Sequence, residues 1–101
     1  MVLENYPAQA LKKQLIEIFK KHLPAANYRI FFFGSRVMGN HRPTSDIDVG
    51  VTGPEPIPVN ILGEIKAEVE NLTILYKIDI VDFSQVPEDF KKVVGKDIEY
   101  L

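Results

Sequence analysis

The sequence contains no cysteine and no long apolar run, and its net charge is small. Without cysteine the chain forms no disulfide and has no thiolate for catalysis or metal binding. No apolar stretch reaches the roughly 20 residues that a membrane-spanning helix needs, and the first residues lack the basic and apolar parts of a signal peptide. The net charge of −2 gives no general attraction to nucleic acid or to anionic membranes. These absences predict a soluble, cytoplasmic protein that binds neither membranes nor, strongly, nucleic acid.

The length and composition indicate one small folded domain. The chain has 101 residues, enough for one modest core. Hydrophobic residues make up 46% of it and charged residues 26%, which is typical of globular proteins and argues against disorder. No internal repeat, low-complexity segment or linker divides the chain, so we expect a single domain over residues 1–101.

Apolar periodicity predicts alternating helices and strands. Apolar residues at three- and four-residue intervals, together with flanking prolines, predict helices over residues 7–22, 58–72 and 88–94. Short aromatic and β-branched runs predict strands over residues 28–33, 46–51 and 75–83. This alternation indicates an α/β fold built on a small three-stranded sheet.

Two aspartates lie one residue apart at the start of the second expected strand. Side chains two apart share a face, about 6–7 Å between their α-carbons, so Asp46 and Asp48 point away from Ile47 and Val49. Two carboxylates at that spacing repel each other by roughly 2–3 kcal/mol, and a divalent cation bound by oxygen ligands would reverse this. Asp79 on the third strand could complete a cluster. An Asp-x-Asp at a strand start is also typical of a solvated loop edge, and the pattern alone leaves both interpretations open.

A Gly-Ser pair ends the first expected strand. Gly34 permits a close approach of the backbone, and Ser35 offers a hydroxyl and a backbone N–H to phosphate oxygens. Arg36, His41 and Arg42 supply positive charge in the same loop. Gly-Ser is also a common turn pair and such cations are often solvated, so this segment by itself is equally consistent with a plain turn.

Taken together, these segments resemble the minimal nucleotidyltransferases of the DNA polymerase beta superfamily. The pattern of that family is Gly-Ser, then Asp-x-Asp, then a carboxylate on a later strand. The residues that match it here are Gly34, Ser35, Asp46, Asp48 and Asp79.

The residues after the Gly-Ser pair extend the resemblance. Arg36 and Gly39 match the usual Gly-Ser-Arg-Ala-Arg-Gly start of the family, whereas Met38 stands where many members carry a second arginine.

The resemblance implies a small mixed three-stranded sheet flanked by helices and a metal-dependent nucleotidyl transfer. It implies Mg²⁺ or Mn²⁺ as the cofactor and a nucleoside triphosphate, ATP in the leading hypothesis, as the substrate. The implied catalytic and metal-binding residues are Asp46, Asp48 and Asp79. The implied nucleotide-binding residues are Gly34, Ser35 and Arg36.

The resemblance also implies a partner. Short members of the family accompany a HEPN-domain protein, and the pair resembles a toxin–antitoxin system in which AMP is added to a tyrosine of the HEPN protein. Two alternatives stay open: an antitoxin that acts by stoichiometric binding without catalysis, and a nucleotidyltransferase subunit for a small-molecule acceptor. A homo-oligomer also remains open at this point.

Overall fold

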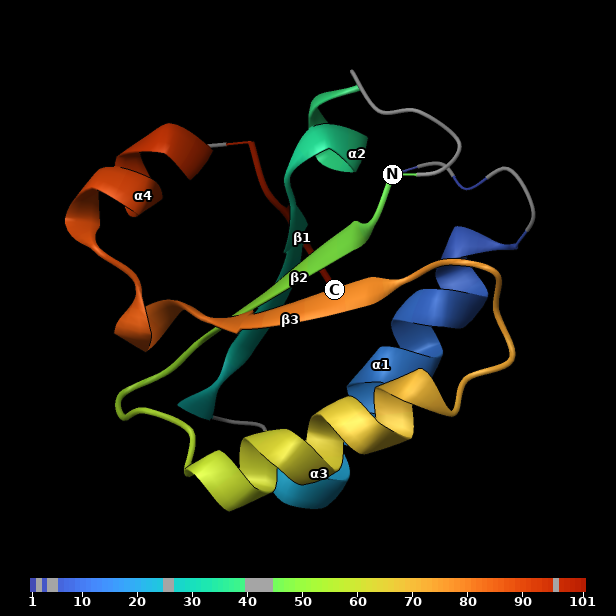
Figure 1. Ribbon diagram of the computed structural model, residues 1–101, viewed down its shortest axis with the longest axis horizontal. Coiled ribbons are helices and arrows are strands. Elements are labelled where there is room, and N and C mark those ends of the chain that lie inside the picture. The colour runs from blue at the N-terminus through green and yellow to red at the C-terminus, as the bar shows by residue number, and fades with distance from the viewer. Residues whose placement is uncertain (2, 4–5, 25–26, 40–44, 96) are drawn as a thin grey trace.

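The computed structural model is a four-stranded sheet with helices on both faces (Figure 1). It describes residues 1, 3, 6–24, 27–39, 45–95 and 97–101. The helices of this described part are α1 (Ala8–His22), α2 (Ser35–Met38), α3 (Val59–Glu70), α4 (Glu88–Val94) and the 3₁₀ helix η2 (Phe83–Gln85). Its strands are β1 (Arg29–Phe33), β2 (Ile47–Thr52), β3 (Ile78–Asp82) and β4 (Glu99–Tyr100). None of these helices has both the length and the apolarity needed to cross a membrane.

The predicted α/β class is confirmed, and the predicted number of strands is wrong by one. The expected helices and strands are all present, with their ends shifted by at most three residues. The additional strand, β4, pairs antiparallel with β1, where Phe31 lies opposite Tyr100 and Phe32 opposite Glu99. A two-residue strand is too short to show an alternation of apolar and polar residues, and its existence depends on the partner strand.

The sheet is mixed, with the strand order β3-β2-β1-β4. Strands β1 and β2 are antiparallel, whereas β2 and β3 are parallel. A parallel pair needs a crossover connection, and α3 provides it between β2 and β3. This crossover brings the start of β3 beside the start of β2, which is the arrangement that positions the acidic residues described below.

Helices α1 and α3 cover one face of the sheet, where they lie side by side (Figure 1). The main core lies between them and the sheet. Its fully buried members, each 0% exposed, are Leu11, Leu15, Ile47, Val49, Val51 and Ile65. Odd-numbered residues of β2 therefore face this core, and Asp48 faces the other way.

A smaller aromatic cluster covers part of the opposite face. The rings of Phe31 and Phe83 are 4.8 Å apart and those of Phe33 and Phe83 are 5.1 Å apart, both edge-to-face, a favourable aromatic geometry. Helix α4 joins this cluster through Phe90, whose ring centroid is 6.2 Å from that of Phe33. Asp48 and Asp79 lie on this same face, next to α4.

Candidate functional site

Asp48 and Asp79 lie next to each other on adjacent strands. They are register partners in the parallel pair of β2 and β3, where neighbouring strands are about 4.8 Å apart. Both point away from the core that buries Val49 and Ile80. Asp46 immediately precedes β2. The fold thus brings together two carboxylates that are 31 positions apart in the chain, with a third close to them.

The surroundings of Asp48 disfavour the charged form of its carboxyl group. Partial burial, then the neighbouring charge of Asp79 and then that of Asp46 raise the pKa of Asp48 above its usual value of 3.8. The Nζ atom of Lys77 is 3.9 Å from an Oδ atom of Asp79, in an exposed position, where an ion pair is only weakly stabilising. Asp48 therefore has two acidic neighbours, and a cation at this position would relieve its repulsion.

Gly34 lies directly against Asp48. Its backbone has φ 81° and ψ −162°, a positive-φ conformation that disfavours residues with a Cβ atom. A Cβ atom at this position would fall 2.2 Å from Oδ2 of Asp48, which is well inside van der Waals contact. Ser35 follows as the first residue of the four-residue helix α2. The Gly-Ser turn therefore lies in direct contact with the acidic pair through Gly34 and Asp48.

Arg36 is buried, with 3% of the residue exposed. Its Nε–H donates a hydrogen bond to the carbonyl oxygen of Ser45, at 2.9 Å. Its guanidinium carbon lies 4.6 Å from the centroid of the Tyr76 ring, within cation–π range. Arg36 thus connects α2 to the residue before Asp46 and to the segment before β3. The direct contact with a nucleotide that the resemblance implies for it stays a prediction, and His41 and Arg42 lie outside the described residues.

Asp82 is on the same strand as Asp79 but belongs to a different environment. It is 8% exposed, and its carboxylate accepts hydrogen bonds from the backbone N–H of Ile57 at 2.8 Å and from the N–H and Oγ–H of Ser84 at 3.0 and 2.7 Å. These bonds attach the loop before α3 to the end of β3. The hydrogen bonds of Asp82 therefore stabilise the fold. Asp79 remains the β3 carboxylate that faces the cavity.

A cavity of about 540 Å³ opens over the acidic pair. Asp48, Asp79 and Gly34 line it on one side, and residues of α4 line the other. The α4 side is apolar and partly exposed: Phe90 is 38% exposed and Val93 80% exposed. The periodicity of the sequence predicts this helix but not its place in the site, because only the tertiary fold brings α4 to this face of the sheet.

The donor set fits a hard divalent cation. All three candidate ligands are carboxylates, the oxygen ligands that Mg²⁺ and Mn²⁺ prefer, and the raised pKa of Asp48 has the repulsion of its two acidic neighbours among its causes. Among the described residues, however, no three His, Asp or Glu side chains converge in the arrangement of a metal site. The fold brings the carboxylates into one neighbourhood without closing a coordination sphere around a point.

The site combines a mixed sheet, an acidic pair on adjacent strands and a Gly-Ser turn beside that pair. Residues 13–100 match the family "Polymerase beta, Nucleotidyltransferase". The chain therefore belongs to the polymerase beta nucleotidyltransferase family, as its motifs indicate.

One curated protein is similar to this chain in sequence. A Haemophilus influenzae protein named "Probable protein adenylyltransferase MntA" is 27% identical over 70 residues, which are 69% of this chain and 61% of the relative. The match therefore spans less than two thirds of that relative's length.

Solved structures agree with the fold. A toxin–antitoxin crystal structure with AMP-PNP has a TM-score of 0.70 at 19% identity, covering 88% of this chain and 70% of that one. The complex of a tri-AMPylated Shewanella oneidensis HEPN toxin with an MNT antitoxin has a TM-score of 0.67 at 17% identity, covering 91% and 69%. At these identities the likeness concerns the fold.

Proposed function

We propose that the protein transfers AMP from ATP to a hydroxyl group of a HEPN-domain protein, as the antitoxin of a toxin–antitoxin pair. The observation that carries this proposal is the register pairing of Asp48 with Asp79 directly beside Gly34. Membership of the nucleotidyltransferase family supports the reaction type. The names of the relatives, an adenylyltransferase and the antitoxin partner of an AMPylated HEPN toxin, support the nucleotide and the acceptor.

The residues of the candidate site have distinct roles in this proposed transfer of AMP. The Gly34 backbone and the Ser35 hydroxyl hold phosphate oxygens of the nucleotide, close to Asp48. Asp46, Asp48 and Asp79 would hold Mg²⁺ or Mn²⁺, which supplies charge stabilisation to the entering and leaving oxygens of the displacement. Asp79 orients the acceptor hydroxyl and accepts its proton as a general base. The acceptor oxygen bonds to the α-phosphorus as the bond from that phosphorus to the bridging oxygen breaks, and pyrophosphate leaves.

The composition of the cavity favours a protein acceptor over a hydroxyl-rich small molecule. Apart from Asp48, Asp79 and the Gly34 backbone, the described residues that line it are apolar. A sugar-like acceptor would leave hydroxyl groups unpaired against this surface, which costs free energy. A protein side chain with one hydroxyl and an apolar body would leave no further hydroxyl groups unpaired against this surface. The net charge of −2 likewise supports a protein acceptor rather than a nucleic-acid acceptor. We place the reaction in the cytoplasm, because ATP is available there.

The test is a mass measurement on the purified pair. The protein is purified together with the product of its neighbouring gene, which we expect to be the HEPN-domain partner, and the pair is incubated with ATP and magnesium. Intact mass spectrometry should show the HEPN protein heavier by one or more AMP units, and the variant Asp48→Asn should abolish the gain. A stable complex whose partner never gains mass would instead support an antitoxin that acts by stoichiometric binding.

A further inference from the structure

Strand β3 lies at one edge of the sheet. The strand order β3-β2-β1-β4 gives it β2 on one side and, within the described part of the chain, no strand on the other. In Figure 1, β3 lies nearest the viewer, in front of β2 and β1, and no described segment is drawn in front of it. Such an edge is a template on which another extended chain can add a strand.

The backbone groups of β3 alternate between β2 and this open edge. The N–H of Ile47 donates a hydrogen bond to the carbonyl oxygen of Lys77, at 2.9 Å, which sets the phase of the parallel ladder. Asp79, two residues further on, therefore also turns its N–H and C=O towards β2, whereas Ile78 and Ile80 turn theirs towards the edge. The backbone of Ile78 and Ile80 is thus positioned to pair with an added strand.

A groove runs along the same edge. It has a volume of about 420 Å³ and lies between the C-terminal part of α3 and residues 72–80. We call it the edge groove. Most of its apolar lining comes from alternate residues of that segment, Leu72, Ile74, Tyr76, Ile78 and Ile80. Polar groups are contributed by Lys66, Glu70, Lys77 and Asp79. The apolar lining suits an aliphatic or aromatic side chain.

The edge groove adjoins the cavity over the acidic pair, because Asp79 and Ile80 line both. Successive side chains of a strand point to opposite faces of a sheet. A strand added beside β3 would therefore place one side chain in the edge groove and the next on the face that carries Asp79. Neighbouring strands are about 4.8 Å apart, which brings that second side chain within reach of the Asp79 carboxylate.

The order of the site across the sheet favours an acceptor that enters from this edge. Gly34 follows β1, Asp48 is on β2 and Asp79 is on β3. In an in-line displacement the attacking oxygen lies opposite the leaving pyrophosphate. With the phosphates beside Gly34, the opposite side is the β3 edge. A second copy of the chain would instead add acidic residues where burial, then the charge of Asp79 and then that of Asp46 already raise the pKa of Asp48.

We propose that the outer edge of β3 binds an extended segment of the protein acceptor as an added strand. An apolar side chain of that segment lies in the edge groove, and the adjacent, hydroxyl-bearing side chain lies beside Asp79. This inference rests on the proposed function, which makes the acceptor a protein and Asp79 the residue that faces its hydroxyl. The apolar body of the reacting side chain meets the exposed Phe90 and Val93 across the cavity. We call the outer side of β3 the docking edge.

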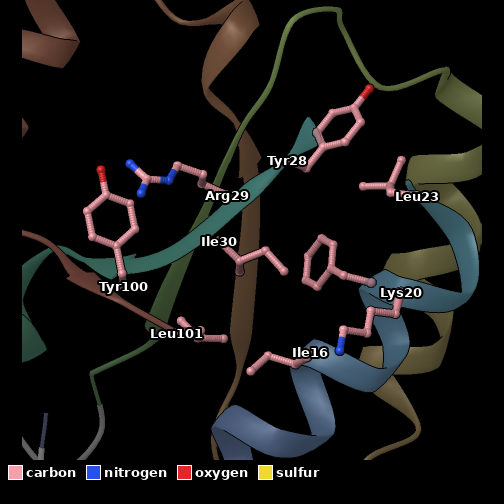
Figure 2. Close-up of a pocket in the computed structure, with 9 residues that line it drawn as sticks. Ile16, Lys20, Leu23, Tyr28, Arg29, Ile30, Tyr100 and Leu101 are labelled. Carbon is pink, nitrogen blue, oxygen red and sulfur yellow. The ribbon is translucent and has the colours of Figure 1, made fainter. Parts of the chain in front are cut away.

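The opposite edge of the sheet supplies a control. The cavity at that edge, formed by α1, β1 and the C-terminal segment (Figure 2), has none of the candidate site residues among the described residues that line it. The N–H of Leu101 donates a hydrogen bond to the carbonyl oxygen of Ile30, at 3.0 Å. By the alternation of an antiparallel ladder, the N–H of Tyr100 therefore points away from β1.

Amide hydrogen exchange, measured residue by residue by NMR, tests the docking edge. The isotope-labelled protein is compared with and without the purified product of its neighbouring gene, which we expect to be the HEPN-domain partner, in the absence of ATP and magnesium. Pairing with an added strand should slow the exchange of the Ile78 and Ile80 amides at least about tenfold. The exchange of the Tyr100 amide should stay within about twofold.

Two neighbouring residues test the edge groove. Ile74 lines it, whereas Leu75 is 86% exposed and is not one of its lining residues. In calorimetry, Ile74→Asp should raise the Kd for the partner at least about tenfold, equivalent to about 1.4 kcal/mol, and Leu75→Asp should change it by less than about twofold. Ile74→Ala should show a smaller rise in the same direction, and thermal melts verify that each variant is folded.

The outcomes separate the docking edge from the reaction. Slower exchange at Tyr100 but not at Ile78 and Ile80, equal affinities of Ile74→Asp and Leu75→Asp, or no binding to the wild type would overturn the docking edge. Slowing that depends on protein concentration without the partner would assign the edge to a second copy and also overturn it. Slower exchange at Ile78 and Ile80 without any gain of AMP in the mass test would overturn the proposed reaction and leave the docking edge standing.

Discussion

At the scale of single residues, the site depends on how closely Gly34 and Asp48 approach each other. The turn that starts α2 lies against the Asp48 carboxylate because Gly34 has no side chain to separate them. The carboxylate in turn has two acidic neighbours and little solvent on one side. Each of these features can be changed by one substitution, and each has a control of its own.

Gly34→Ala should destabilise the protein by about 1–3 kcal/mol, because alanine would have to adopt a positive φ and its Cβ atom would collide with Asp48. Gly63→Ala is the control. Gly63 lies inside α3, and nothing lies within 4 Å of the position that a Cβ atom would take there, so this change should stabilise the protein by roughly 0.5–1 kcal/mol. Urea denaturation measures both, and a neutral Gly34→Ala variant would contradict the close approach.

Asp48→Asn should raise the metal-free stability at neutral pH. The pKa of Asp48 is raised in the folded state above 3.8, so the folded state binds the proton more tightly than the unfolded state does. Wild-type stability therefore falls as the pH rises from 3.8 towards the raised pKa. Asparagine carries no charge to repel, and the advantage of the variant should vanish at pH values below 3.8. Thermal melts across this pH range measure the difference.

Magnesium provides the control for this variant. If the carboxylates bind the cation, magnesium should raise the melting temperature of the wild type and leave that of Asp48→Asn unchanged. A variant that melts below the metal-free wild type at neutral pH would show that Asp48 stabilises the fold.

At the scale of secondary-structure elements, β3 carries two aspartates in different environments. Asp79 faces the cavity beside Asp48, and Asp82 is buried and hydrogen-bonded to Ile57 and Ser84. The two residues are three positions apart, so the alternation of the strand places them on opposite faces.

Asp79→Asn should reduce the rate of transfer at least about a hundredfold, equivalent to roughly 2.7 kcal/mol of barrier, with little change in stability. Asp82→Asn should keep the rate within a few-fold of wild type but lose about 1–3 kcal/mol of stability, because the Ile57 and Ser84 donors lose part of their acceptor. Initial rates are measured well below both melting temperatures. An inactive Asp82→Asn with an active Asp79→Asn would mean that the ligand on β3 is assigned to the wrong residue.

Helix α2 depends on Arg36, which connects it to Ser45 and Tyr76. Arg36→Lys keeps the charge but loses the planar guanidinium that makes both contacts. If these contacts define its role, Arg36→Lys and Arg36→Ala should destabilise the protein to similar extents, as thermal melts would show. Recovery of wild-type nucleotide affinity by Arg36→Lys, measured with AMP-PNP, would instead show that the positive charge itself acts on the phosphates.

At the scale of the whole molecule, one core connects the two covering helices to the sheet. Helices α1 and α3 contact each other as well as the strands. Glu68 of α3 also accepts hydrogen bonds from Lys21 and His22 at the end of α1, which lower the pKa of this carboxyl. A continuous buried cluster favours cooperative behaviour.

We therefore expect residues 1–101 to unfold in one two-state transition, as small single domains do. The melting curves from circular dichroism and from aromatic fluorescence should coincide, and the calorimetric enthalpy should equal the van 't Hoff enthalpy. Two separate transitions would show that the aromatic cluster with α4 unfolds independently of the α1–α3 core.

The sequence by itself determined the three longer helices, the three longer strands and the motif residues. Periodicity of 3.6 or 2 is a local property, so it shows which side of each element is apolar before any partner is known. For β2 it already separates Asp48 from Val49, and the structure buries Val49 completely. The Gly-Ser and Asp-x-Asp spacing was sufficient to indicate the family.

The tertiary structure decided what depends on contacts between distant segments. The pairing of Asp48 with Asp79 follows from the parallel register of β2 and β3, and the apolar wall of the cavity follows from where α4 is placed. Strand β4 has only two residues and exists through its hydrogen bonds to β1. The burial of Arg36 depends on Tyr76, which is 40 positions further along the chain. No local pattern encodes these contacts, because each is stabilised only when both segments are already in place.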